Sequence, residues 1–124
     1  MAAPNLRNPT TVTYTSFATS LADTSATTIV NNAASSGTVV EIVSLYVCND
    51  DGSSAADITV ALHPEDDGGG TGVEMASTIS VPADATLVVV SKEAPIYLEE
   101  DESLVATASA GGDLNCVGSY RVLS

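Results

Sequence analysis

The sequence contains few aromatic residues. Its 124 residues include no tryptophan, one phenylalanine and four tyrosines, so the core must be built from small aliphatic side chains. Such a core buries limited apolar area, and contacts between subunits would add to the stability. The composition therefore predicts a homo-oligomer, and we take a trimer as the expected state.

Basic residues are scarcer still. Arg7, Lys92 and Arg121 stand against 16 acidic residues, and the formal net charge is -13. Nucleic-acid binding depends on clustered Lys and Arg side chains that displace counterions from phosphates. Three scattered cations cannot form such a cluster, so we expect neither nucleic acid nor an anionic membrane surface as a partner. The acidic surface is expected to be solvated.

Long apolar runs are also absent. No run approaches the ~20 residues that span a bilayer. The N-terminal residues lack the cationic segment and apolar core of a secretory signal. We therefore expect no membrane segment and no secretory leader.

The sequence offers no catalytic set. His63 is the single histidine, so it has no second histidine with which to form a zinc site, and no nucleophile motif surrounds either cysteine. The four acids of Glu99–Glu102 are typical of a solvated turn rather than of a catalytic pair. We predict no enzymatic activity, no catalytic residues and no cofactor.

Two acidic loops could offer oxygen ligands to a cation. They lie after Asn49 and at Glu65–Gly68, but neither has the ligand spacing or the flanking helices of an EF-hand. We predict no metal site, and a weakly bound surface cation stays an open alternative. Cys48 and Cys116 lie in apolar segments typical of buried thiols, and a disulfide between them is also left open.

One apolar segment dominates the chain, Thr38–Asn49, with the sequence TVVEIVSLYVCN. Its β-branched residues favour a strand, and both its even and its odd positions are largely apolar. This pattern predicts a central strand that is covered on both faces. The turn residues Asn49–Ser54 follow, and Asp57–His63 then alternates as a half-buried strand does, so we predict a hairpin.

Further strand-like segments follow at short intervals, and no convincing helix separates them. They are Thr11–Thr19, Thr24–Val30, Val73–Val81, Thr86–Ser91, Ala94–Leu98, Ser103–Ser109 and Leu114–Leu123. Parallel strands need crossover helices, so the pairing should be antiparallel. The sequence predicts an all-β protein, an antiparallel β-sandwich of about eight short strands with jelly-roll-like or Greek-key connections. The predicted core residues are Val40, Ile42, Leu45, Val47, Ile58, Val60, Leu62, Leu87, Val89, Leu104 and Val122.

Two segments lack any strand pattern. His63–Gly72 is rich in Gly and acids and is expected to be an exposed loop. Residues 1–10 contain two prolines and two asparagines and are expected to be an extended arm, whereas residues 11–124 form one domain. We predict that this arm binds a neighbouring protein through Met1, Ala2, Ala3, Pro4, Asn5, Leu6, Arg7, Asn8, Pro9 and Thr10.

Most of the chain resembles a known group of proteins. The segments VVEIVSLYVCNDDGSSAADITVALH and ISVPADATLVVVSKEAPIYLEEDESLVATASAGGDLNCVGSYRVLS, in this order, resemble small virion structural proteins of tailed bacteriophages. The shared features are a strand that ends in Cys-Asn, a polar hairpin, a Val-Pro-Ala turn and a Leu-rich strand before an acidic turn. The resemblance covers roughly Thr24 to Ser124.

The resemblance implies a β-sandwich subunit of a virus particle. It could be a head decoration (cement) protein, a neck or collar component, or a tail-associated protein. The net charge of -13 is unsuited to the DNA-filled interior and favours the outer surface. We expect a decoration protein that binds the major capsid protein or other virion proteins and is assembled in the host cytoplasm.

A carbohydrate-binding module is the alternative from another functional class, since such modules are also β-sandwiches. They stack sugar rings on exposed aromatic side chains. The strand pattern assigns most aromatic residues of this chain to the core, which argues against the alternative. These residues are Tyr14, Phe17, Tyr46, Tyr97 and Tyr120.

Overall fold

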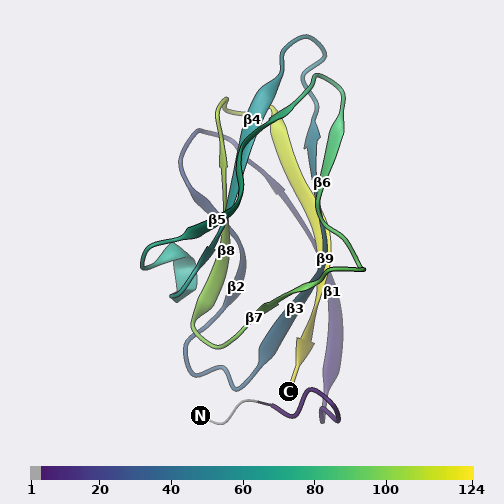
Figure 1. Cartoon of the computed structure of the whole chain (residues 1–124), viewed down its shortest axis with the longest axis vertical. Coiled ribbons are helices and arrows are strands. Elements are labelled where there is room, and N and C mark those ends of the chain that lie inside the picture. Colours follow the sequence, from purple (N-terminus) through teal and green to yellow (C-terminus); the bar gives the residue numbers. More distant parts are fainter. Residues whose placement is uncertain (1–3) are drawn as a thin grey trace.

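A computed structural model describes residues 4–124, which form nine β-strands and a single 3-10 turn in two packed layers (Figure 1). The elements are β1 (Val12–Ser20), β2 (Thr27–Asn32), β3 (Val39–Asn49), β4 (Ala56–His63), η1 (Asp66–Gly68), β5 (Val73–Val81), β6 (Thr86–Val90), β7 (Ile96–Leu98), β8 (Glu102–Ala108) and β9 (Leu114–Leu123). Within these residues no helix has the length and apolar character needed to cross a membrane.

The strands form two antiparallel sheets. Sheet A has the order β1-β9-β3-β6, with β7 also paired to β3, and sheet B has the order β2-β8-β4-β5. Successive strands mostly alternate between the sheets, which is the winding of a jelly roll. The predicted all-β antiparallel sandwich is confirmed.

The predicted hairpin of β3 and β4 is wrong, because the two strands lie in different sheets. Asn49, at the end of β3, is fully buried at the crossing. Its Nδ2 donates to the carbonyl oxygens of Ser54 and Val81, each at 2.9 Å, and its Oδ1 accepts from the Asp51 N–H at 3.0 Å. The Asn49 side chain thus attaches the connection between β3 and β4 to β5 of sheet B.

The core lies between the two sheets and contains the predicted residues. Those that are buried are Val40, Ile42, Leu45, Val47, Ile58, Val60 and Leu104. The others are half-buried and pack against this core at its margin, namely Leu62, Leu87, Val89 and Val122. The aliphatic core expected from the composition is therefore present.

Strand β3 contains a β-bulge at Val43. Ile42 pairs with Tyr120 of β9, and Ser44 pairs with the preceding β9 residue, Ser119, so Val43 has no partner in the β9 register. An extra residue in one strand reverses the alternation of side chains that follow it.

The bulge explains why β3 is apolar at both even and odd positions. Ile42 before it and Leu45 after it both point into the core and are fully buried, whereas Tyr46 points outward and is exposed. The prediction that both faces of β3 are covered holds before the bulge, where Val39 and Glu41 are buried as well as Val40 and Ile42, and it is wrong after the bulge, where Tyr46 is exposed.

Gly118 of β9 lies opposite the bulge, paired with Leu45. A Cβ at this position would overlap the Ser44 carbonyl oxygen and come within 2.9 Å of two ring carbons of Phe17. A glycine is therefore required where the bulged backbone and the Phe17 ring converge.

The loop between β4 and β5 lies at the surface, as predicted, but it is anchored to sheet B. The Gly68 N–H donates to Ser103 Oγ at 2.9 Å, and Ser103 Oγ donates to the Glu65 carbonyl at 2.8 Å. Ser103 itself is fully buried. The exposed loop is thus also held to the packed structure by two hydrogen bonds of a buried side chain.

We predict that Leu45→Ala lowers the free energy of unfolding by about 2 to 5 kcal/mol, because it leaves a cavity between the sheets. Tyr46→Ala is the matched control, since it truncates the neighbouring side chain on the outer face. Urea denaturation should show a much smaller change for the control. Equal losses for the two variants would contradict the assigned bulge.

Candidate binding surface

A row of polar and aromatic side chains crosses the outer face of sheet A. The strand register places Tyr14 of β1 beside Arg121 of β9, Arg121 beside Glu41 of β3, and Glu41 beside Tyr97 of β7. We call these four residues the Arg121 row. Their alignment follows from the sheet, because directly opposed residues of adjacent strands lie on the same face.

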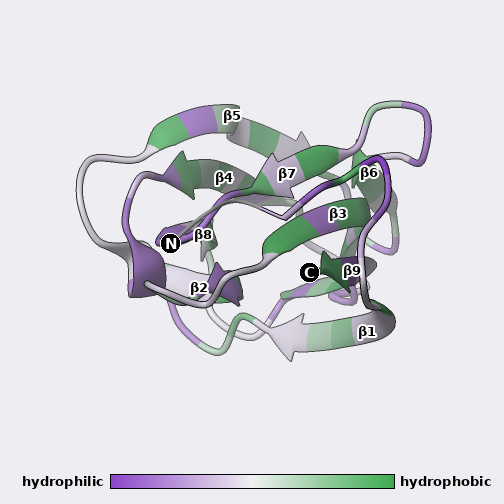
Figure 2. Ribbon diagram, turned by 90° about the horizontal axis from the view of Figure 1, so that it is seen from below, coloured by the Kyte–Doolittle hydropathy of each residue, from purple (hydrophilic) through white to green (hydrophobic). Residues whose placement is uncertain are grey.

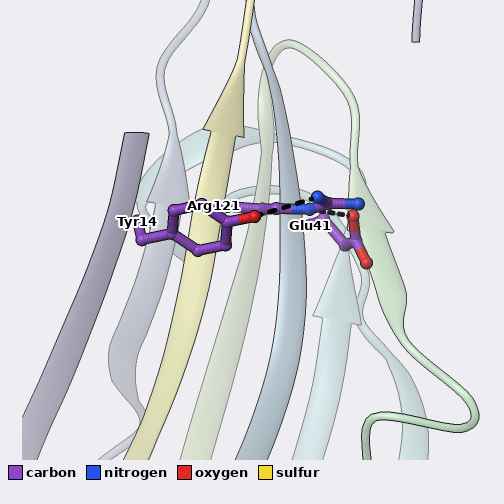
Figure 3. A network of polar contacts seen from close by, with 3 residues as sticks. All are labelled: Tyr14, Glu41 and Arg121. Carbon is purple, nitrogen blue, oxygen red and sulfur yellow. Dashed lines mark hydrogen bonds and ion pairs between the residues drawn. The ribbon is translucent and has the colours of Figure 1, made fainter. Parts of the chain in front are cut away.

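Arg121 is the centre of this row (Figure 3). Its Nε donates to Glu41 Oε1 at 2.5 Å, and its Nη1 donates to the Tyr14 hydroxyl at 3.4 Å. The side chain of Glu41 is 9% exposed and that of Arg121 is 33% exposed. The hydrogen bond to Glu41, followed by that to Tyr14, raises the pKa of Arg121 above its ordinary value, so the guanidinium stays charged.

A shallow pocket of about 350 Å³ opens beside the ion pair. It is lined by Tyr14, Glu41, Val43, Lys92 and Arg121. Lys92 lies on the connection between β6 and β7 and is exposed. The pocket therefore gathers two of the three basic residues of the chain. An ammonium and a guanidinium around a small hollow can bind a carboxylate through charge-assisted hydrogen bonds.

A second row on the same face is apolar. The register aligns Ala18 of β1, Val117 of β9, Tyr46 of β3 and Val88 of β6. All four are exposed. We call them the apolar row. Together with the Arg121 row and the adjoining Lys92 it gives sheet A an outer face that combines exposed apolar area with an ion pair and one further positive charge, and an exposed apolar patch with a polar rim is typical of a protein-binding surface.

The structure corrects the assignment of three tyrosines to the core. Tyr14, Tyr46 and Tyr97 lie on the outer face of sheet A and are exposed, with Tyr14 at 72%. Tyr46 is turned outward by the bulge, and Tyr14 lies on an edge strand. Phe17 and Tyr120 do pack against the core, with their ring centroids 5.9 Å apart.

The predicted N-terminal arm is only partly within the described residues, because Met1, Ala2 and Ala3 lie outside them. Asn5 Oδ1 accepts the N–H groups of Arg7 at 3.1 Å and Asn8 at 3.3 Å, which forms a turn. The Thr10 N–H donates to the Ser124 carbonyl at 2.5 Å, so the segment that precedes β1 lies beside the C-terminal end of β9 (Figure 1). Partner binding by the arm stays a prediction.

The outer face of sheet A was not predicted from the sequence. Two charged residues within apolar strands, Glu41 in β3 and Arg121 in β9, could have indicated this surface. A charged residue inside an apolar strand is costly unless it is paired. The two residues are 80 positions apart, however, and only the fold shows that they are neighbours.

His63 is not brought together with either cysteine. It ends β4 in sheet B, and its Nδ1 lies 3.2 Å from the Gly69 carbonyl oxygen, whereas Cys48 and Cys116 belong to sheet A. Within residues 4–124 no three His, Cys, Asp or Glu side chains are grouped as metal ligands would be.

The two cysteines point to opposite faces of sheet A and are both free. Cys116 is fully buried, and burial raises its pKa from the ordinary 9.0 to about 11. Its thiol stays protonated in the folded state while the unfolded state ionises, so this group lowers stability as the pH rises from about 9 to about 11.

We predict that an alkylating reagent at pH 8 modifies Cys48 and spares Cys116 in the folded protein, because only thiolates that solvent reaches react rapidly. Mass spectrometry should find one label per native chain and two after denaturation in urea. An unlabelled chain that gains two labels only after reduction would instead reveal a disulfide.

We also predict that Arg121→Met lowers the free energy of unfolding by about 1 to 3 kcal/mol, because the nearly buried Glu41 carboxylate loses its partner. The double variant Glu41→Gln/Arg121→Met should recover part of this loss. Urea denaturation of both single variants and the double variant measures the coupling. Additive effects would show that the pair contributes nothing.

No family model and no curated protein sequence matches the chain. Several solved structures are similar to the chain, including the following two. A chain from Bacillus endospore appendages, described as a novel family of disulfide-linked pili, is 15% identical with a TM-score of 0.54, and the match covers 100% of this chain and 97% of that chain. A chain from the acidic stable capsid of a Helicobacter pylori bacteriophage is 8% identical with a TM-score of 0.55, and the match covers 94% and 90%. At these identities the likeness shows a common fold alone.

Proposed function

We propose that the chain is a non-enzymatic structural subunit of a virus particle, and that it decorates the outer surface of a tailed-phage capsid. The proposal rests on the outer face of sheet A. In a protein of net charge -13, this one face gathers Lys92, Arg121 and an exposed apolar row. The jelly roll that the chain shares with a phage capsid chain is compatible with this role.

The proposed attachment uses both rows of the face. The apolar row loses contact with water against the major capsid protein, and this burial provides most of the affinity. Lys92, whose charge Glu41 does not compensate, pairs with acidic groups of the shell and orients the subunit. The many acidic residues elsewhere stay in water, which suits a position outside the shell and away from packaged DNA.

The N-terminal arm, residues 1–10, adds a second contact in this proposal. Its described part ends at Thr10, which bonds to the C-terminal residue Ser124, and Leu6 and Arg7 are both exposed. A neck, collar or tail position in the same kind of particle is the alternative. Quantitative mass spectrometry of purified particles separates the two, because a decoration protein is present in many copies and a neck or tail protein in few.

The attachment surface can be tested with a pair of valine variants and emptied shells of the virus that encodes the chain. Val88→Glu places a charge in the apolar row, whereas Val73→Glu places one on β5 of sheet B. Both valines are exposed, at 53% and 72%, so neither change should unfold the protein.

We predict that Val88→Glu weakens binding to shells by about tenfold or more, whereas Val73→Glu leaves it unchanged. Deleting residues 1–9 should weaken binding while the melting temperature stays near that of the full chain. Cosedimentation measures all three. Unchanged binding of Val88→Glu would reject the outer face of sheet A as the attachment surface.

The exposed tyrosines support a second candidate function, carbohydrate binding. Tyr14 and Tyr97 flank the ion pair on a sheet face, where aromatic rings could stack on a sugar. A glycan-binding screen tests it, with Tyr14→Ala as the informative variant. Specific glycan binding that this variant loses would favour the sugar-binding role over attachment to protein.

A further inference from the structure

The edges of the two sheets differ in how well they are protected. The edge strand is β1 on one side of sheet A and β6 with β7 on the other, and β2 and β5 are the edges of sheet B. Edge strands carry unpaired N–H and C=O groups, and proteins block them with short strands, bulges, charges or proline. Three of these four edges carry such features.

The second edge of sheet A is interrupted. Residues 91–95 separate β6 from β7 and include Lys92, Glu93 and Pro95. Two charged residues and a proline within a gap between two short strands leave no continuous edge to which another strand could pair.

Both edges of sheet B are irregular. Strand β5 has two register shifts against β4, and Thr78 within it has a φ of 45°. Strand β2 has six residues with a register shift between Thr28 and Val30, and the Asp67 N–H of the anchored loop donates to its Asn31 side chain at 2.8 Å. Neither edge offers a straight ladder of donors and acceptors.

Strand β1 has none of these features. All nine of its residues pair with β9 in unbroken register, from Val12 with Leu123 to Ser20 with Asn115. Its sequence, VTYTSFATS, contains no charged residue, proline or glycine. Figure 2 shows the same strand without a strongly hydrophilic segment. It is a long, regular and uncharged edge.

The hydrogen bonds at the ends of β1 show which backbone groups face the open edge. The N–H of Thr11 donates to the carbonyl oxygen of Ser124, and the N–H of Ser124 donates to that of Thr11. At the other end, the Leu21 N–H donates to the carbonyl oxygen of Leu114. In an antiparallel pair the bonded residues alternate, so the odd-numbered residues of β1 bond to β9. The even-numbered residues therefore direct their N–H and C=O groups away from β9. They are Val12, Tyr14, Ser16, Ala18 and Ser20.

We propose that β1 pairs antiparallel with β1 of a second copy of this chain, around a two-fold axis at Ser16. The two copies of sheet A then form one continuous sheet. Among residues 4–124, β1 is the single unblocked edge. In a second copy of the chain, β1 is therefore again the edge that is free to pair with it. A two-fold contact of this kind is closed and self-complementary.

Charge favours this contact. Two chains of net charge -13 repel one another, and they can approach with least repulsion where neither carries acids. Strand β1 has no acidic residue, and the charged residue that faces it on β9, Arg121, is paired with Glu41. The contact predicts a dimer, in place of the trimer expected from the composition.

Ser16→Pro tests the pairing, because it removes an N–H that faces the open edge and that β9 does not use. Ser16→Ala is the matched control, since it keeps the N–H and loses only the hydroxyl. Sedimentation velocity from micromolar to millimolar concentration should find dimers for the natural chain and for Ser16→Ala, and monomers for Ser16→Pro with an unchanged circular dichroism spectrum.

A natural chain that stays monomeric or forms trimers, or a Ser16→Pro variant that still dimerises, would overturn the proposal. If Ser16→Pro does not fold, hydrogen exchange of the natural chain decides. The amides of Tyr14, Ser16 and Ala18 should become protected as the concentration rises, and unchanged exchange would reject the pairing. These measurements use the isolated protein, so they are independent of binding to a shell.

Discussion

The extra residue in β3 determines what each side of sheet A presents. With unbroken alternation, Leu45 would share a face with Glu41, and one of the two would be misplaced. The bulge at Val43 directs Leu45 inward and Tyr46 outward. It is compatible with the sheet because Gly118 leaves room for the displaced backbone. The core and the outer face therefore depend on the same local irregularity.

Two basic residues on the outer face have different roles, because Arg121 stabilises the fold and Lys92 attracts anions. Arg121 is largely compensated by Glu41, whose carboxylate is nearly buried, so removing Arg121 leaves an unpaired charge and affects stability. Lys92 is exposed on a connection outside the strands. It supplies the uncompensated positive charge of the pocket. The anion preference of this surface is therefore a property of Lys92 more than of the arginine at its centre.

Local patterns predicted the elements well and their partners poorly. The bounds of β5 and β9 agree with those expected, because alternation and turn residues are local signals. The crossing at Asn49 depends on a bond to Val81, 32 residues away, which no local pattern contains. The same holds for the outer face, since Glu41 and Arg121 become neighbours only through strand order. The predicted core residues agree with the structure because these aliphatic side chains would be buried in any arrangement of these strands.

The open edge and the outer face of sheet A share residues. Tyr14 and Ala18 contribute side chains to the Arg121 row and the apolar row, while their backbone groups point to the edge. Pairing about Ser16 would set Ala18 of one copy opposite Tyr14 of the other, so the apolar row of each copy would continue into the Arg121 row of its partner. The outer faces of sheet A from the two copies would lie on the same side of the continuous sheet. A shell that binds one face would then hold the second at high effective concentration, and two weak contacts would together attach the dimer tightly.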